Sequence, residues 1–239
     1  MSVIRAEGVT VEKGRRVVVR DVTVAVEAGE VLGVLGPSGA GKSTFFGALV
    51  GEEELASGRV WLGDEEVTKL PLWRRARMGL GYVPQSPSVL WDLSVRDNLR
   101  TFSQVAKRGQ SPAEIRQAAE AVGLEGRLEV RAGALSGGER RRLELARALT
   151  TSPTVLICDE PFAGVDPQGA AHLGDLLAAL ASTRRVAVLL ADHHVEEALR
   201  VCTKALLLLD GVVATVAEPA AFREDPLVRG RYLGTLLPQ

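Results

Sequence analysis

The sequence is poor in cysteine and aromatic residues and carries almost no net charge. Its 239 residues include two cysteines, 4% aromatic residues and a formal net charge of −1. Cys158 and Cys202 lack the spacing of a metal site, so we expect them to pack in the core as free thiols. A nearly neutral chain has no global basic field, which argues against nucleic acid or an anionic membrane surface as a partner.

Long apolar runs are also missing. No run approaches the roughly 20 residues that a helix needs to cross a bilayer, and residues 1–5 lack the apolar region of a signal peptide. We therefore expect a cytoplasmic chain. No low-complexity segment, linker or repeat divides the 239 residues, which are enough for a sizeable core.

One glycine-rich segment carries the strongest signal. Residues 36–44 read Gly-Pro-Ser-Gly-Ala-Gly-Lys-Ser-Thr and fit the phosphate-loop pattern G-x-x-x-x-G-K-[ST] without a mismatch. An apolar run at 31–35 precedes them and a helix-compatible segment at 45–50 follows, which is the context that the pattern requires. The alternative, a glycine-rich turn that binds nothing, leaves this complete and correctly flanked pattern unexplained.

The residue types of this loop suit a nucleotide. Its glycines can take positive φ, so that successive N–H groups and the helix N-terminus surround a phosphate chain. Lys42 then supplies charge to the β and γ phosphates, and the Ser43 hydroxyl is a ligand for Mg²⁺. The predicted nucleotide-binding residues here are Gly36, Pro37, Ser38, Gly39, Ala40, Gly41, Lys42, Ser43 and Thr44.

Apolar periodicity predicts the elements around the loop. Strand patterns, in order, cover residues 4–11, 17–26, 58–67, 81–85, 154–160, 186–191, 205–209 and 212–216. The first two form an antiparallel pair, 58–67 is a hairpin, and Asp210-Gly211 predicts a hairpin between the last two. Helical patterns cover residues 94–126, 140–150 and 169–181, with Ser94 and Ser111 as N-caps and a short basic turn or helix at 71–77.

These elements predict an α/β fold of the P-loop NTPase type. Its core is a mostly parallel sheet covered on both faces, with an antiparallel β subdomain and an inserted helical subdomain. We expect one domain over residues 1–239, with the helical subdomain at about 86–150 and a C-terminal hairpin and helical tail at about 205–239.

Two acids end the strand pattern at 154–160. Asp159 and Glu160 would lie at the same sheet edge as the phosphate loop. Asp159 then suits Mg²⁺, and Glu160 suits polarisation of the attacking water, because phosphoryl transfer depends mainly on positioning and electrostatics. Without the loop, two acids facing solvent at a strand end would be the default interpretation.

A second anion-binding helix start follows Leu135. Residues 135–139 read Leu-Ser-Gly-Gly-Glu, and one nucleotide does not need two such termini from one subunit. Over nearly the whole chain, the sequence resembles the ATP-binding cassette (ABC) family through an ordered set of motifs: residues 36–44, Gln85, 135–139, 154–160, 163–166 and His193.

The resemblance implies an ATPase that uses ATP and Mg²⁺. Two cassettes would face head to tail, with Ser136, Gly137 and Gly138 of one copy reaching the γ-phosphate bound by the other. Gln85 would sense Mg²⁺, water and the membrane partner, Asp166 would lie at the dimer interface, and His193 would contact the γ-phosphate. We expect His194 to be a surface residue.

The resemblance also implies partners other than the second copy. Integral-membrane permease subunits would hold the chain at the inner face of the cytoplasmic membrane. The segment around Leu90 and Trp91 would receive a coupling helix from them. Arg140, Arg141 and Arg142 are interpreted as a solvated or phosphate-adjacent face, since the neutral overall charge argues against a nucleic-acid patch.

One position departs from the family pattern. The family usually stacks an aromatic residue on adenine just before the second strand, and here that position is Glu12. No aromatic residue precedes Phe45, so any stacking would fall to an arginine such as Arg15 or Arg16. This predicts weak selectivity for adenine.

Several stretches narrow the resemblance. Residues 13–18, 81–85, 93–99, 137–149, 159–167 and 228–234 are similar to the cassettes that power lipopolysaccharide export. Export of lipopolysaccharide or a related envelope glycolipid is therefore the expected function. Branched-chain amino-acid import and a non-transport regulator, as in cell division or translation, remain alternatives.

Overall fold

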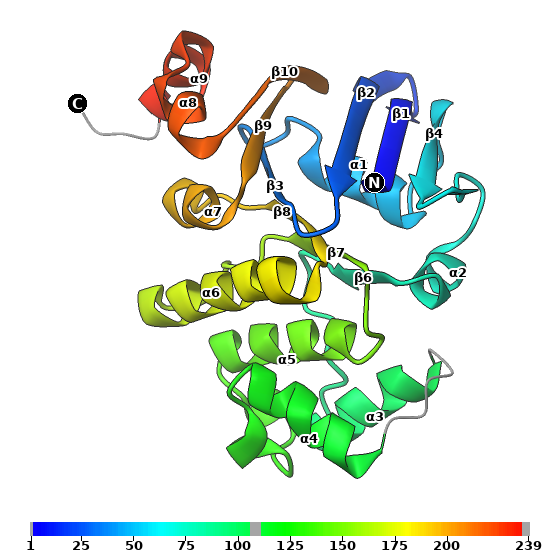
Figure 1. The fold of residues 1–239 in the computed structure, drawn as a ribbon, viewed down its shortest axis with the longest axis vertical. Helices are drawn as coiled ribbons and strands as arrows, with labels where there is room; N and C mark the ends of the chain where they lie inside the picture. The colour runs from blue at the N-terminus through cyan, green and yellow to red at the C-terminus, as the bar shows by residue number, and fades with distance from the viewer. Residues whose placement is uncertain (1, 106–110, 236–239) are drawn as a thin grey trace.

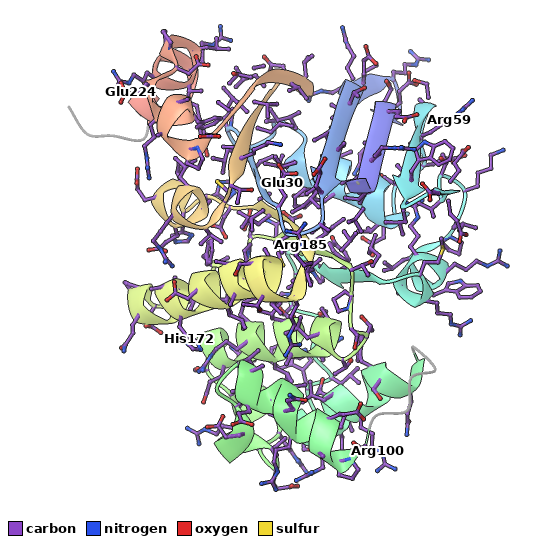
Figure 2. All side chains as sticks on the ribbon, viewed as in Figure 1. Glu30, Arg59, Arg100, His172, Arg185 and Glu224 are labelled. Atoms are coloured by element: carbon purple, nitrogen blue, oxygen red, sulfur yellow. The ribbon has the colours of Figure 1, made fainter. Side chains whose placement is uncertain are left out.

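The computed structural model describes residues 2–105 and 111–235, which form two sheets with helices packed around them (Figure 1). The parts of the predicted helical section and tail at 106–110 and 236–239 lie outside the described residues. Charged side chains of both signs, such as Arg59, Arg100 and Glu224, lie at the periphery (Figure 2). In the part of the chain that the structure describes, no helix is both long and apolar enough to span a bilayer.

The central sheet has six strands in the order β10-β9-β3-β8-β7-β6. Five strands run parallel, and β10 pairs antiparallel with β9. Every residue of β3, β7 and β8 is buried, as expected for parallel strands covered on both faces. The strands are β3 (Val31–Leu35), β6 (Leu80–Val83), β7 (Val155–Asp159), β8 (Ala187–Ala191), β9 (Lys204–Leu209) and β10 (Val212–Ala217).

The second sheet is antiparallel and has the order β2-β1-β4-β5. Its strands are β1 (Ser2–Lys13), β2 (Arg16–Glu27), β4 (Ser57–Leu62) and β5 (Glu65–Glu66). The predicted strand pair, the β4–β5 hairpin and the β9–β10 hairpin are confirmed. Asp210 and Gly211 both have positive φ, which is what a tight two-residue hairpin turn requires.

The central sheet separates two hydrophobic cores. In β7, Leu156 and Cys158 pack with the helices on one side, whereas Val155 and Ile157 pack on the other side, with the antiparallel sheet and the helix that follows the phosphate loop. This alternation follows from the two-residue period of a strand. Cys158 and Cys202 are buried free thiols in the first core, as predicted.

The helices are arranged around these sheets as Figure 1 shows. A helical section between β6 and β7 contains α3, α4 and α5, and the predicted fold class is confirmed. The helices are α1 (Lys42–Val50), α2 (Leu72–Arg77), α3 (Val95–Val105), α4 (Pro112–Ala121), α5 (Gly137–Leu149), α6 (Pro167–Arg184), α7 (Val195–Val201), α8 (Pro219–Glu224) and α9 (Pro226–Arg231). Short 3₁₀ turns lie at Glu125–Arg127, Ala132–Ala134 and Leu233–Thr235.

One helix start differs from its prediction. The pattern places the helix after Leu-Ser-Gly-Gly-Glu at residue 140, but α5 begins at Gly137. Ser136 and Glu139 form a capping box, in which each side chain accepts from the other residue's backbone N–H. This box draws both glycines into the first helical turn, despite their low helix propensity.

Candidate nucleotide site

The phosphate loop connects β3 to α1 and depends on three glycines with positive φ. Gly36, Gly39 and Gly41 have φ of 153°, 78° and 103°. A Cβ at Gly36 would lie 2.2 Å from the carbonyl oxygen of Leu208, and one at Gly41 would lie 2.8 Å from that of Val18. The loop is therefore pressed against neighbouring backbone and leaves no room for side chains at these two positions.

Lys42 is the first residue of α1 and is largely buried. Its Nζ donates to the carbonyl oxygens of Gly36 at 2.7 Å and Pro37 at 3.0 Å, so the ammonium curls back over the loop. Burial lowers the pKa of Lys42, and the negative charges of Glu160, Asp159 and Asp192 act in the opposite direction. Three carboxylates near one buried ammonium make this the electrostatic centre of the loop.

The two predicted acids lie at the end of β7, next to the loop. Asp159 is 2% exposed and its carboxylate hydrogen-bonds the Ser43 side chain. Burial is the main cause that raises its pKa; the Ser43 hydrogen bond lowers it, and the charge of Glu160 raises it. The structure thus brings Lys42, Ser43, Asp159 and Glu160 together.

These residues fit a phosphate-bound Mg²⁺. A hydroxyl and a buried carboxylate are hard oxygen ligands, which Mg²⁺ prefers. Among residues 2–105 and 111–235, no cluster of three or more His, Cys, Asp or Glu side chains could hold a metal. One hydroxyl and one carboxylate suit a Mg²⁺ ion whose other positions are filled by phosphate oxygens and water.

Glu160 contacts His193, the first of the two histidines that follow Asp192 after the end of β8. Its Oε1 lies 2.7 Å from Nε2 of His193. Glu160 has a positive φ of 54°, which is uncommon for a residue with a side chain, and its N–H donates to the carbonyl of Ala191 at 2.7 Å. The ends of β7 and β8 are thereby joined directly at the two predicted catalytic groups.

Sequence reasoning missed a third carboxylate at this edge. Asp192 is 1% exposed; one of its oxygens accepts from the Phe162 N–H, and the other accepts from the His194 N–H and lies 2.8 Å from the His194 Nδ1. It therefore ties the segment after Glu160 to His194. An aspartate directly before a histidine at a strand end is the signal that would have identified it. His194 is half-exposed.

The predicted second anion site lies elsewhere on the chain. Ser136 caps α5 and its oxygen accepts from the Glu139 N–H at 3.2 Å, which leaves the hydroxyl hydrogen available. Gly137 and Gly138 lie against the 164–165 backbone, where an added Cβ would meet the carbonyl oxygen of Gly164 at 3.1 Å or the Val165 side chain at 3.5 Å. Asp166 follows as the N-cap of α6 and accepts from the Gly169 N–H at 3.0 Å.

Gln85 is exposed and lies just after β6. Leu90 and Trp91 are also exposed, at 37% and 48%, and the buried amide of Asn98 fixes the backbone of Leu90 through two hydrogen bonds. The ring of Trp91 lies under the guanidinium of Arg140, 5.2 Å away.

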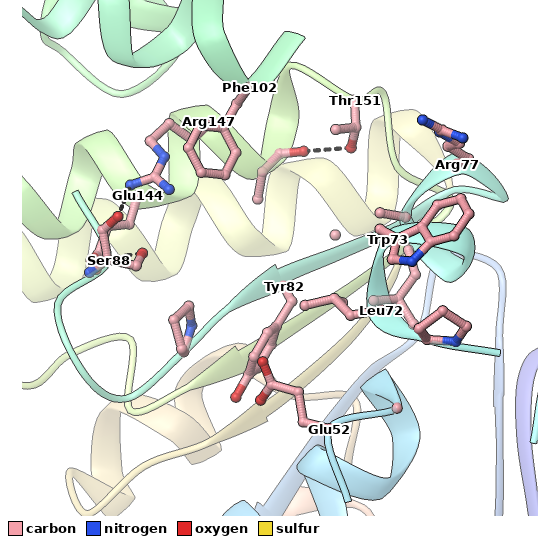
Figure 3. A pocket seen from close by; sticks show the side chains of 17 residues that line it. Glu52, Leu72, Trp73, Arg77, Tyr82, Ser88, Phe102, Glu144, Arg147 and Thr151 are labelled. Atoms are coloured by element: carbon pink, nitrogen blue, oxygen red, sulfur yellow. Dashed lines mark hydrogen bonds between the residues drawn. The ribbon is translucent and has the colours of Figure 1, made fainter. Parts of the chain in front are cut away.

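A groove of about 730 Å³ opens close to this segment (Figure 3). It is bounded by the residues that follow α1, by α2, β6, Pro84, Ser88, α3 and α5. Leu90 and Trp91 are not among its lining residues. Trp73, at 49% exposure, Tyr82 and Phe102 give it an aromatic lining. The charged residues that line it are Glu52, Arg77, Glu144 and Arg147.

The interpretation of Arg140–Arg142 as one solvated or phosphate-adjacent face is wrong for Arg141. Arg141 is 6% exposed and donates to carbonyl oxygens of Pro84, Asp159 and Glu160. Arg142 instead donates to the carbonyls of Val122 and Gly123. The helical period sends consecutive side chains in different directions, so a run of three arginines cannot form one face.

The comparisons with known proteins agree with this geometry. The family model described as ABC transporter matches residues 19–163. The chain is 45% identical over 224 residues to the lipopolysaccharide export system ATP-binding protein LptB of Acidithiobacillus ferridurans, covering 92% of each chain. It is 40% identical over 227 residues to LptB of Escherichia coli strain K12, covering 93% of this chain and 92% of that protein.

Solved structures share the whole fold. An ATP-binding cassette of an ABC transporter in its ADP conformation has a TM-score of 0.87 at 25% identity, covering 98% of this chain and 99% of that one. A dimeric cassette in a post-hydrolysis state, bound to ADP and Pi, has a TM-score of 0.80 at 24% identity, covering 90% and 98%. The chain belongs to the ABC transporter family, as an ATPase subunit.

Proposed function

We propose that this chain is the ATPase subunit of a transporter that exports lipopolysaccharide or a related envelope glycolipid, and that it works as a head-to-tail homodimer. The observation that carries the ATPase part of the proposal is that Lys42, at the start of α1, lies near the charges of Asp159 and Glu160 at the end of β7, and that Glu160 contacts His193 beyond the end of β8. The names of the relatives at 45% and 40% identity support the cargo.

Each group in this site has a role that its geometry supports. Lys42 and the loop N–H groups bind the β and γ phosphates. Ser43, Asp159 and Gln85 would hold Mg²⁺, which would neutralise charge on the phosphates. Glu160 orients and polarises the attacking water, and His193, already in contact with Glu160, binds the γ-phosphate. The remaining loop residues shape the phosphate cradle.

The homodimer supplies what one copy lacks. Ser136, Gly137 and Gly138 lie at the start of α5, in the helical section, and the phosphate loop precedes α1 on the other side of the central sheet (Figure 1). A second copy packed head to tail would bring its α5 N-terminus to the γ-phosphate. Asp166 would lie in that interface. The fold shared with a dimeric cassette supports this arrangement.

Permease subunits would dock in the groove beside β6. Its exposed tryptophan and neighbouring aromatic side chains suit the apolar face of an amphipathic helix. Glu144 and Arg147 connect the groove to the backbone of Ser88, three residues after Gln85. Docking would place the chain at the inner face of the cytoplasmic membrane, with Leu90 and Trp91 as additional contacts.

The proposed ATPase cycle is tested with Glu160→Gln. The substitution keeps the shape of the side chain but removes the charge that polarises water, so we expect turnover to fall by about 10²–10⁴-fold. ATP binding should remain, and an ATP-bound dimer should accumulate in light scattering. A monomer whose turnover per chain does not depend on protein concentration would contradict the homodimer.

The transport partner is tested by purification of the tagged chain from its native membranes in mild detergent. Paired permeases with large periplasmic β-rich domains would support glycolipid export. Permeases with a solute-binding protein would point to amino-acid import, and recovery without any membrane partner would point to a soluble regulator.

The groove is tested with Trp73→Ala in the same purification. We expect permease recovery to fall while the ATPase rate of the isolated chain stays unchanged. Val216→Ala is the control, because Val216 is a comparably exposed apolar residue on β10, outside the groove. Equal permease recovery with both variants would exclude Trp73 from the docking surface.

A further inference from the structure

Helix α5 carries a row of charged side chains into the protein interior. Arg141, Glu144 and Arg147 recur every three residues and are 6%, 5% and 4% exposed. Charged residues are almost never buried to this extent unless they are paired. Their partners are on segments that also carry the proposed catalytic groups, so the row calls for a functional explanation as well as a structural one.

Arg141 has the contacts closest to the chemistry. Its Nη2 donates to the carbonyl oxygens of Asp159 and Glu160, the latter at 2.8 Å. Its Nη1 donates to the carbonyl of Pro84 at 2.7 Å and to Oε2 of Glu144 at 2.7 Å. One planar guanidinium therefore joins α5, the residue before Gln85 and the backbone of Glu160, the proposed catalytic residue.

The backbone of Glu160 needs such support. A φ of 54° is strained for a residue with a Cβ, and such conformations persist only where the surroundings hold them. The Glu160 N–H is held by the carbonyl of Ala191, and the carbonyls on both sides of this strained φ are held by Arg141. Loss of the guanidinium would let the peptide rotate and move the carboxylate away from its place opposite His193.

Glu144 and Arg147, the other two residues of the row, hold Ser88 on the far side of Gln85. Glu144 accepts from the Ser88 N–H at 2.5 Å and the Ser88 hydroxyl at 3.1 Å, and Arg147 donates to the Ser88 carbonyl at 2.5 Å. Residues 84 and 88, which flank Gln85, are thus both bonded to α5. Figure 3 shows Ser88, Glu144 and Arg147 together at the edge of the groove.

We propose that Arg141 is a positioning residue for ATP hydrolysis: it sets the backbone conformation of Glu160 and ties it to the position of α5 and of the segment around Gln85. The proposal rests on the proposed function, because it needs Glu160 to act on the attacking water. A shift of α5 relative to the central sheet would then change the alignment of the carboxylate, with phosphate binding at Lys42 left intact.

The test is Arg141→Lys, which keeps the charge but presents all its donors at one point. A lysine cannot reach the carbonyls of residues 84, 159 and 160 together. We expect kcat of the full chain to fall about tenfold to a hundredfold, with KM for ATP within about twofold of wild type, since the phosphate loop is unchanged. Arg142→Lys on the same helix is the matched control, and its kcat should equal that of the wild type.

A double variant separates positioning from mere structural support. If Arg141 acts through Glu160, Arg141→Lys should cause no further loss in a Glu160→Gln background, as measured by single-turnover hydrolysis of labelled ATP. An equal fold-loss in both backgrounds would overturn the proposal. A wild-type kcat for Arg141→Lys beside an inactive Glu160→Gln would overturn it too, but would leave the proposed function standing.

A further variant covers the case in which Arg141→Lys does not fold. Arg141→Met combined with Glu144→Gln removes both members of the Arg141–Glu144 ion pair together, so neither is left facing an absent partner. Arg147 keeps its hydrogen bond to the Ser88 carbonyl, and the amide oxygen introduced by Glu144→Gln can still accept from Ser88. The same fall in kcat is expected with this pair, and unchanged kcat would overturn the proposal. Wild-type turnover with Glu160→Gln would overturn both the proposal and the proposed role of Glu160.

Discussion

Glu160 and His193 face each other across the ends of two parallel strands, with Oε1 and Nε2 2.7 Å apart. Neither residue needs a long loop to reach the other, because β7 and β8 are adjacent and in register, with Asp159 opposite Ala191. The contact leaves half of the His193 side chain exposed. A ring held in this way can turn toward a phosphate and still keep its backbone fixed.

His193→Ala should therefore impair turnover more than binding. Loss of a hydrogen-bond donor to the transferring phosphoryl group typically lowers kcat by about 10²–10³-fold, and ATP affinity should change little. The neighbouring His194→Ala is the control, since His194 contacts Asp192 rather than Glu160. Steady-state kinetics give kcat and KM of the two variants. A comparable loss of kcat in both would contradict a specific role for His193.

Asp159→Asn should stabilise the nucleotide-free chain. Burial raises the pKa of Asp159, so the ionised carboxylate opposes folding at neutral pH, and this penalty lessens as pH falls toward the raised pKa. A neutral amide removes the penalty, and we expect a gain of about 0.5–2 kcal/mol in the free energy of unfolding.

The same variant should lose the additional stabilisation that Mg²⁺ and ATP give together. Thermal melts at neutral pH, with and without the nucleotide and metal, measure both effects. A nucleotide-free melting temperature at or below that of the wild type would show that burial of Asp159 carries no such penalty.

Glu139→Ala should remove the capping box of α5. The backbone N–H of Ser136 and, to a smaller extent, the nearby Arg127 hold the pKa of Glu139 below its usual value against some desolvation. We expect a loss of about 1 kcal/mol at neutral pH. The stabilisation is present above the usual glutamate pKa and disappears as pH falls through the lowered one.

Denaturant melts across this acidic range measure the effect of Glu139→Ala. Glu120→Ala, an exposed substitution on α4, serves as its control. The two variants should converge at low pH, and a destabilisation by Glu139→Ala that does not depend on pH would count against the capping box.

Glu12→Tyr should tighten the binding of both ATP and GTP. Glu12 is exposed near the end of β1, and its neighbour Lys13 forms an ion pair with Glu53 at 2.7 Å. A stacked aromatic side chain contributes about 1–3 kcal/mol to the binding of a base, and the wild-type chain has none there. We expect wild-type kcat/KM for ATP and GTP to agree within about tenfold, and a strong wild-type preference for ATP would refute this.

Local chemistry explains which parts of the structure could be predicted from the sequence. The phosphate loop, the Asp210-Gly211 hairpin and the cap at Ser111 follow from residues close together in the chain. The strand that ends at Asp159 is identifiable by its unbroken apolar run. These features need only backbone preferences and the burial of short segments.

Contacts between residues that are far apart in the chain cannot be predicted from such local preferences. Arg75 belongs to a basic segment that resembles a surface turn, but it is 1% exposed and donates to the carbonyls of Leu70, Ala48, Leu49 and Thr68. Arg141 is also buried, and its carbonyl partners also lie far from it in the sequence. In both cases most of the partners are backbone oxygens, which every residue has, so the sequence offers little complementary charge to look for.

The central sheet divides the apolar packing of the protein into two layers, one on each of its faces. Side chains of alternate residues in β3, β7 and β8 belong to different cores, so a substitution at one position changes the packing on one side and a substitution at the next position changes it on the other. The strand ends carry the proposed catalytic groups, and α5, whose Leu143 and Leu145 pack on the side of Leu156 and Cys158, reaches them through Arg141. An engineer could therefore vary the apolar side chains on the side of Val155 and Ile157 without touching the contacts of Arg141, whereas repacking the side that holds α5 would also move the support of Glu160.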